Sequence, residues 1–153
     1  MRSSESEATR AIMVATPSNP TGTVIPADEL AAMADLAREK HGALLVDEIY
    51  HGLIYDQPTP TALALSDDLF VINSFSKYFC MTGWRLGWLV VPDTYVREVE
   101  KLAQNLFIAA PTLAQYAALA AFEEESLAIL EQHRQAFQQR RDYLLPALRE
   151  LGF

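Results

Sequence analysis

Lys77 is the side chain of this sequence best suited to covalent chemistry. The chain contains three lysines, and Lys40 and Lys101 lie in polar segments typical of an exposed helix surface. Lys77 instead follows an apolar run and stands among the aromatic residues of 74–79 (SFSKYF). Burial there would lower the pKa of its amine and supply the neutral nucleophile that forms a Schiff base with a carbonyl group. Alternatively, Lys77 is a loop lysine whose stem packs on apolar neighbours while its ammonium stays in water.

Asp47 is the second candidate, because it directly follows the apolar run 43–46 (ALLV). A carboxylate at the end of a buried strand needs a cationic partner or compensating hydrogen bonds. Asp47 could therefore face a positively charged ligand group, or it could cap the N-terminus of a following helix. Asp47 alone does not decide between the two.

Polar side chains follow three predicted strands, the apolar runs 11–15, 43–46 and 69–73. These side chains are Asn19, Asp47, Tyr50, Ser74, Ser76 and Lys77. In an open parallel sheet, ligands bind beyond the carboxyl ends of the strands. We therefore expect the polar side chains to converge on one edge of the sheet.

Hydrophobic periodicity predicts the elements that must position this edge. Pro26 and two acidic residues begin a helix whose apolar positions recur to about residue 40. Further helices are expected over 94–107, from 111 to 123 and from 126 onward, with a fourth strand over 86–91. Continuous apolar strands separated by a helix or a long connection favour a parallel sheet covered on both faces. The expected fold class is α/β, with three layers and a mostly parallel sheet flanked by helices.

Composition excludes several partners. The 153 residues, half of them hydrophobic, suit one globular domain, and the net charge of −8 has the wrong sign for binding a nucleic-acid backbone. The uncharged segment 102–122 is long enough to span a bilayer. However, Pro111 and five scattered polar residues indicate the ends of two core helices instead. We therefore expect neither nucleic acid nor membrane as a partner.

The cysteines and histidines of the sequence indicate its cellular compartment and whether it could bind a metal ion. Cys80 is the single cysteine, so no intramolecular disulfide can form. Residues 1–10 lack the apolar core of a secretory signal and are expected to form a polar tail, which favours a cytoplasmic location. The three histidines are neither spaced nor accompanied like metal ligands, so no metal site is predicted.

The stretch 74–87 (SFSKYFCMTGWRLG) resembles the cofactor attachment signature of the class I and II, aspartate-aminotransferase-like enzymes, which use pyridoxal 5'-phosphate. In that fold-type I signature, a lysine forms an internal aldimine with the cofactor, and an arginine eight residues later binds the cofactor phosphate. Lys77 and Arg85 have this spacing. Two further family motifs occur in the required order, 18–22 (SNPTG) and 46–50 (VDEIY). Cys80 departs from the Gly, Ser or Ala that is more common at its position.

The resemblance implies that Lys77 is catalytic. It would hold the cofactor and then carry a proton at the substrate α-carbon while an amino group moves between an amino acid and a 2-oxo acid. Asp47 would keep the pyridine nitrogen of the cofactor protonated. The other cofactor-binding residues implied are Asn19 and Tyr50 at the phenolic oxygen, Arg85 and Ser74 at the phosphate, and, with a weaker claim, Ser76.

Members of this family are much longer than the chain. We therefore expect residues 11–125 to be part of the cofactor-binding large domain, truncated at both ends, and residues 126–153 to be a long helix leading to a small domain. The remaining segments would supply a phosphate-binding loop, the aromatic that stacks on the cofactor ring and the arginine that binds the substrate carboxylate. The 153-residue piece is accordingly expected to be inactive, and the complete protein to be a homodimer.

Two other functions are alternatives, and the first of them shares the three motifs. Lyases on the same scaffold, of the carbon–sulfur lyase or aminocyclopropane-carboxylate synthase type, differ in substrate-side residues outside this chain. The sensory domain of some transcription regulators also resembles an aminotransferase, binds the cofactor and follows a basic DNA-binding domain. The sequence upstream of Met1 would distinguish this last alternative.

Overall fold

The computed structural model describes residues 8–56 and 58–153. Its strands and helices, in chain order, are β1 (Ala11–Ala15), α1 (Ala27–Glu39), β2 (Ala43–Asp47), β3 (Phe70–Ser74), β4 (Gly87–Val90), α2 (Val96–Leu106), α3 (Thr112–Ala120) and α4 (Glu124–Glu150). Each strand and helix expected from the periodicity is present, with small shifts at its ends. The expected tail at 1–10 falls mostly outside the described residues.

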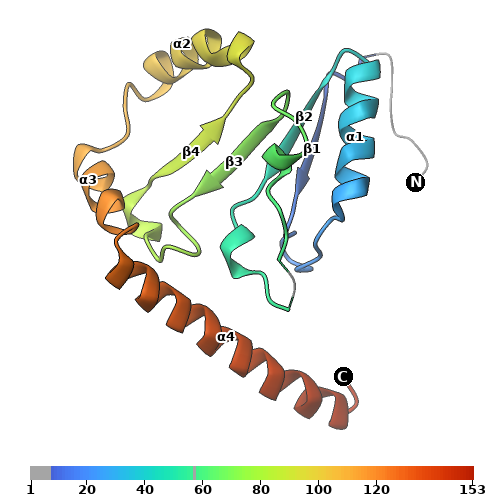
Figure 1. The fold of residues 1–153 in the computed structure, drawn as a ribbon, viewed down its shortest axis with the longest axis vertical. Coiled ribbons are helices and arrows are strands. Elements are labelled where there is room, and N and C mark those ends of the chain that lie inside the picture. Colours follow the sequence, from blue (N-terminus) through green and yellow to red (C-terminus); the bar gives the residue numbers. More distant parts are fainter. Residues whose placement is uncertain (1–7, 57) are drawn as a thin grey trace.

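The sheet has four strands in the order β1-β2-β3-β4 (Figure 1). β1, β2 and β3 run parallel, whereas β4 is antiparallel to β3. The reversal at β4 arises because residues 75–86 form a loop with one short turn and no helix that could carry the chain back across a face. The sheet is therefore mixed and mostly parallel, as the expected fold class states.

The main core lies between α1 and the sheet. α1 buries Leu30, Ala34 and Ala37, which recur at helical spacing on one side of the helix. They pack against Leu44 and Val46 of β2, which are almost completely buried. A second, smaller core cluster joins α3 to the loop after β3 and contains Phe75, Met81, Ala118 and Ala121.

The opposite face of the sheet is only partly covered by the residues that the structure describes. Ile12 and Val90 pack on the α1 side, so their neighbours Met13 and Leu89 point to the other face, because side chains alternate along a strand. Met13 is 68% exposed and Leu89 is 44% exposed. Within the described chain, the helical layer on the α1 side is thus the better formed of the two.

α2 and α3 lie at the β4 end of the sheet, on either side of Pro111 (Figure 1). The division of segment 102–122 into two helix ends is confirmed, and no helix of the described chain is long and apolar enough to cross a membrane. Their description as core helices is wrong for the described chain, in which α2 buries nothing and α3 buries only Ala114 and Ala118. Only small side chains of α3 reach the core, and the large ones face outward. The large exposed side chains of α2, of α3 and of the link between them include Leu102, Leu106, Phe107, Ile108, Leu113, Tyr116 and Leu119.

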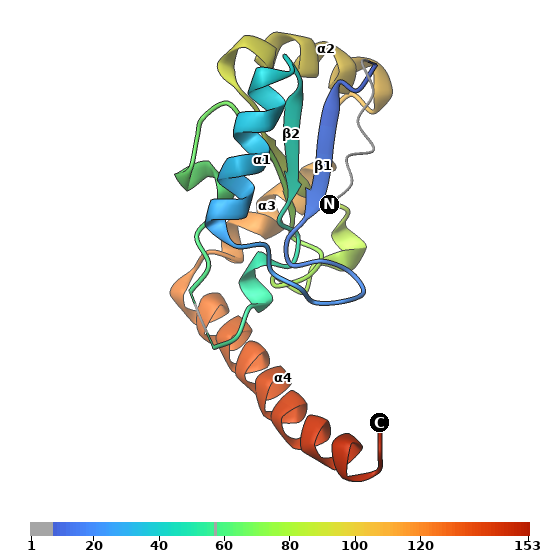
Figure 2. The same cartoon turned by 90° about the vertical axis from the view of Figure 1, so that its right-hand side faces the viewer.

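α4 is a 27-residue helix that projects away from the sheet in both views (Figures 1 and 2). Leu130, near its N-terminus, is its one buried residue. Residues of its middle turns contact the loop that follows β2, as the hydrogen bonds of Arg134 to Ile54 and of Arg141 to Asp56 show. The two elements are therefore joined at a point close to the carboxyl ends of the strands.

Candidate active site

The carboxyl ends of the three parallel strands lie side by side. Ala15 pairs with Asp47, and Asp47 pairs with Ile72. The ladder continues one residue further, because the backbone N–H of Thr16 donates to Asp47 O at 3.0 Å and that of Glu48 donates to Ile72 O at 2.8 Å. The three following loops therefore start from one edge, where the polar residues were expected to converge.

Asn19, Tyr50 and Lys77 meet at this edge, although each follows a different strand. Asn19 Nδ2 lies 3.2 Å from the Tyr50 hydroxyl, to which it donates a hydrogen bond. Lys77 Nζ lies 5.2 Å from the centroid of the Tyr50 ring, a distance at which an ammonium is attracted to an aromatic face. Asn19 is held by a tight loop in which Gly22 N–H donates to Ser18 O and Gly22 has the left-handed φ of 69° that favours glycine.

The adjacent acids Asp47 and Glu48 have different environments. Asp47 Oδ1 accepts a hydrogen bond from Ile49 N–H at 3.0 Å, so this oxygen caps the turn that follows β2. Asp47 Oδ2 has no hydrogen-bond partner among the described residues. Glu48 is 3% exposed, and its two oxygens accept from the Thr61 hydroxyl at 2.8 Å and from Ala62 N–H at 2.6 Å. Glu48 thus holds the loop at 61–62, while Asp47 keeps one oxygen available to a ligand.

Ser74, Ser76 and Arg85 belong to the loop that joins β3 to β4. The Ser74 hydroxyl lies 3.0 Å from the Ser76 hydroxyl and donates to Leu86 O at 3.1 Å. Arg85 has a left-handed φ of 53°, and one guanidinium N–H donates to Thr82 O at 3.0 Å. In residues 8–56 and 58–153, neither Arg85 nor Lys77 forms an ion pair with a carboxylate. Their positive charges therefore remain available to an anionic ligand.

The donor set at this edge fits the functional groups of pyridoxal 5'-phosphate. An unpaired guanidinium and two hydroxyls could bind the phosphate, and the free oxygen of Asp47 could face the cationic nitrogen of the ring. The Asn19 amide and the Tyr50 hydroxyl could donate to the phenolic oxygen, and the Lys77 amine could bond to the carbonyl carbon. These four polar or reactive groups of the cofactor thus each have a side chain of complementary chemistry at this edge.

A cavity of about 460 Å³ opens beside Asn19 and Tyr50, between the loop at 17–24, the segment 53–55 and α4. Tyr55 and Arg141 line it, and neither was predicted as a site residue from the sequence. No local pattern marked them, because Arg141 belongs to the polar side of a long helix and Tyr55 is one of several scattered aromatics. Their proximity depends on how α4 packs on the loop after β2.

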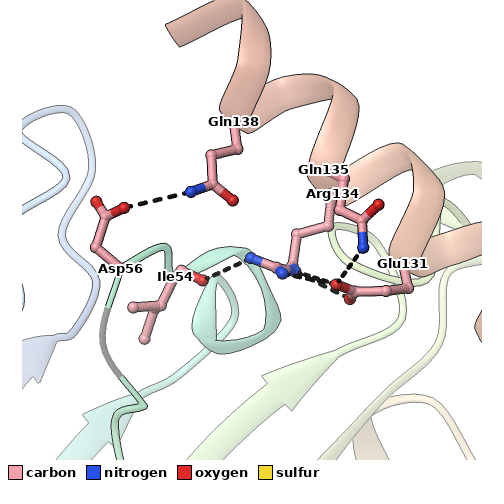
Figure 3. A network of polar contacts seen from close by, with 6 residues as sticks. All are labelled: Ile54, Asp56, Glu131, Arg134, Gln135 and Gln138. Atoms are coloured by element: carbon pink, nitrogen blue, oxygen red, sulfur yellow. Dashed lines mark hydrogen bonds and ion pairs between the residues drawn. The ribbon is translucent and has the colours of Figure 1, made fainter. Parts of the chain in front are cut away.

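Two arginines of α4 hold the end of that loop, in a network that Figure 3 shows in part. Arg134 donates to both carboxylate oxygens of Glu131 and, at 3.3 Å, to Ile54 O. Gln138 Nε2 donates to Asp56 Oδ1 at 3.3 Å, and Arg141 binds both Asp56 oxygens, at 2.8 Å and 3.2 Å. The hydrogen bonds from Arg141 hold the pKa of Asp56 below its ordinary value.

The segment after Tyr50 also contacts the segment that carries Lys77. Tyr78 packs directly on the backbone of Gly52, where an added Cβ would lie 2.5 Å from a ring carbon. Burial raises the pKa of Tyr78, and the negative charge of Glu131 on α4 raises it further. The positions of Tyr50 and Lys77 are therefore linked through this contact as well as through their direct one.

Comparison with known proteins supplies the family. The chain matches the family model of aminotransferase class I and II over residues 2–153. It is 46% identical to a valine–pyruvate aminotransferase of Mycobacterium tuberculosis, over 94% of this chain and 37% of that protein. It is 38% identical to a (5-formylfuran-3-yl)methyl phosphate transaminase of Methanocaldococcus jannaschii, over 97% of this chain and 40% of that protein.

Solved structures agree with this assignment. An aminotransferase structure from Mycobacterium tuberculosis superposes with a TM-score of 0.90 at 44% identity, covering 96% of this chain and 41% of that one. Aspartate aminotransferase from Thermus thermophilus with maleate gives a TM-score of 0.89 at 34% identity, covering 97% and 40%. The chain thus spans about two fifths of the length of these relatives. It belongs to the class I and II aminotransferases, a family of pyridoxal-phosphate-dependent enzymes.

Proposed function

We propose that the complete protein is an aminotransferase that moves an amino group between an amino acid and a 2-oxo acid, with Lys77 as the residue that bonds to pyridoxal 5'-phosphate. The observation that carries this proposal is the meeting of Asn19, Tyr50 and Lys77 at the carboxyl ends of three neighbouring strands. Each of the three comes from a different family motif. Their contact supports one shared site.

The bound cofactor supplies an electron-withdrawing ring that stabilises negative charge at the substrate α-carbon. In our proposal, Arg85 binds its phosphate through a charged hydrogen-bonding fork, and the hydroxyls of Ser74 and Ser76 contribute to the anion site. The carboxylate of Asp47 holds the proton on the ring nitrogen. The free Asp47 oxygen and the unpaired charge of Arg85 support these roles.

Asn19 and Tyr50 donate hydrogen bonds to the phenolic oxygen in this proposal, and both can do so because each side chain carries a donor. Lys77 Nζ moves the proton at the α-carbon once the substrate amine has taken its place. The position of Lys77 Nζ, 5.2 Å from the centroid of the Tyr50 ring and so beside one of the two proposed donors, supports this role.

The relatives favour amino transfer over the lyase alternative, because several of them bear aminotransferase or transaminase names. Those names include valine–pyruvate, aromatic and aspartate/prephenate specificities, so we propose the reaction type and the substrate class of amino acids and 2-oxo acids. We also propose a homodimer and a cytoplasmic location. The exposed apolar side chains of α2 and α3 support a partner subunit, and the single cysteine supports a reducing compartment.

Borohydride reduction of the complete protein in the presence of pyridoxal 5'-phosphate tests the proposal. The reduced cofactor should remain covalently attached, and peptide mapping should find it on Lys77. Lys40 and Lys101 serve as internal controls, because both have the same amine but stand apart from the three motifs. Label on either of them in preference to Lys77 would contradict the assignment.

A further inference from the structure

We propose that Tyr55, Asp56, Arg134 and Arg141 form a clamp through which α4 positions the hydroxyl of Tyr50. This inference rests on the proposed function, since it concerns the Tyr50 hydroxyl as a donor to the cofactor. The four residues, called the α4 clamp below, are positioning residues. They act through Tyr50 and need not touch the cofactor themselves.

The first part of the clamp is the contact between Arg141 and Asp56. Arg141 binds the two Asp56 oxygens with two separate N–H groups, at 2.8 Å and 3.2 Å. Such a bidentate pair fixes orientation as well as distance, because the guanidinium fork and the carboxylate are both planar. Gln138 adds a hydrogen bond to the same carboxylate. Asp56 is therefore held from two neighbouring turns of α4.

The second part is the ring of Tyr55, which both arginines approach. The guanidinium carbon of Arg134 lies 5.7 Å from the ring centroid, and that of Arg141 lies 5.0 Å from it. The two arginines are seven residues apart, which places them on the same side of the helix two turns from one another. Arg134 also donates to Ile54 O, so three consecutive residues of the loop contact α4.

The connection from this clamp to Tyr50 is short. Only the turn His51–Leu53 separates Tyr50 from Ile54, and it is closed by the hydrogen bond from Leu53 N–H to Tyr50 O at 2.8 Å. The other side of Tyr50 is continuous with β2. Only one turn therefore separates residues 54–56 from Tyr50. A shift of these residues along α4 passes through that turn and changes the position of the Tyr50 hydroxyl relative to Asn19.

The clamp contributes to position more than to overall stability. The Arg141 and Asp56 side chains are 38% and 59% exposed, and exposed ion pairs contribute little to the free energy of unfolding. A role in positioning instead predicts a change in the cofactor environment. The hydrogen bond that Tyr50 would donate stabilises the negative charge on the phenolic oxygen of the cofactor. That charge then attracts a proton on the nearby Lys77 nitrogen less strongly, so the hydrogen bond lowers the pKa of this nitrogen. Weakening the bond should therefore raise the pKa of the cofactor chromophore.

The test uses the complete protein and two measurements, the pKa of the bound chromophore and the amide hydrogen exchange of residues 50–56 without cofactor. Asp56→Asn and Arg141→Gln should speed exchange in this segment and raise the pKa by roughly 0.2–0.7 units, the range that one exposed ion pair can supply. Arg141→Lys, which keeps the charge but lacks the fork, should give a smaller rise. Asp142→Asn is the matched control, because Asp142 also pairs with Arg141 at 2.7 Å but lies on α4 itself.

If the α4 clamp acts through the Tyr50 hydroxyl, Asp56→Asn should have no further effect on the chromophore pKa in a protein that already carries Tyr50→Phe. An additional shift there, or unchanged chromophore pKa in both clamp variants, would overturn the inference. Equal effects of Asp142→Asn and Asp56→Asn would overturn it as well. If the unmodified protein shows no cofactor chromophore, the proposed function itself is contradicted. If the chromophore is present and its pKa is the same in the clamp variants, only the proposal of the α4 clamp is contradicted.

Discussion

Asp47 and Glu48 show how two neighbouring acids in one motif take different tasks. Both oxygens of Glu48 are hydrogen-bonded to the loop at 61–62, so this buried carboxylate is compensated within the chain. Within the described part of the chain, Asp47 uses only one oxygen, for Ile49 N–H. Asp47 therefore caps a turn and not the following short helix, whose N-cap is Tyr50, and this task is compatible with a ligand partner because each concerns a different oxygen of the carboxylate.

Asp47→Asn separates these two tasks. The amide oxygen can still accept from Ile49 N–H, so the fold should be kept, but the charge that would hold a proton on the cofactor ring is removed. We expect kcat for amino transfer in the complete protein to fall roughly a hundredfold or more, with cofactor binding still detectable by absorbance. Glu48→Gln is the control and should lower thermal stability more than turnover. Unchanged turnover in Asp47→Asn would show that this residue only caps the turn.

At the scale of elements, Gly52 determines how closely the turn after Tyr50 approaches the segment that carries Lys77. Gly52→Ala would place a methyl group 2.5 Å from the Tyr78 ring, and Tyr78 is adjacent to Lys77. We expect the free energy of unfolding to fall by about 1–3 kcal/mol, a usual cost of overpacking. Because Tyr50 and Lys77 would also be displaced, the affinity for pyridoxal 5'-phosphate should fall in a spectroscopic titration.

Gly83→Ala is the matched control for that substitution. A Cβ at Gly83 meets no atom within 4 Å, so its effect on stability should stay within about 0.5 kcal/mol. Equal melting temperatures for the two variants would mean that the turn after Tyr50 moves freely to accommodate the methyl group. The contact between Gly52 and Tyr78 would then not set the distance between the two elements.

At the scale of the whole molecule, the exposed apolar side chains of α2 and α3 govern how the 153-residue chain behaves by itself. Ile108 is 83% exposed and Leu106 is 75% exposed, beside further large apolar side chains. Many large apolar side chains exposed on neighbouring segments favour association. We expect the chain made as it stands to self-associate in sedimentation velocity experiments at micromolar concentration.

The same chain should also be unable to transfer an amino group. It spans about two fifths of the length of its relatives, and the family resemblance places the stacking aromatic and the substrate arginine outside it. The assay is a single turnover of cofactor-loaded chain with glutamate, aspartate or alanine, with the complete protein as reference. A comparable rate for the two would show that the residues described here suffice for the reaction.

The sequence by itself determined the elements of the fold and predicted the residues of the site. Strand and helix positions follow from hydrophobic periodicity, which is a local property of the chain, and they were predicted to within a few residues. The convergence of Asn19, Tyr50 and Lys77 was also predictable, because it needs only the rule that ligands lie beyond the carboxyl ends of parallel strands. The family followed from three ordered motifs that fix residue types and spacing.

Only the tertiary structure decided which residues surround that site. Asp56 and Arg141 are 85 positions apart, and nothing in either local sequence indicates the other. Their pairing depends on the direction in which α4 leaves the sheet. The antiparallel direction of β4 depends on the path of the loop at 75–86. The exposure of the α2 side chains likewise depends on which segments pack against that helix. Such contacts arise from packing between distant segments, and packing is a property of the assembled fold that neither periodicity nor motif spacing encodes.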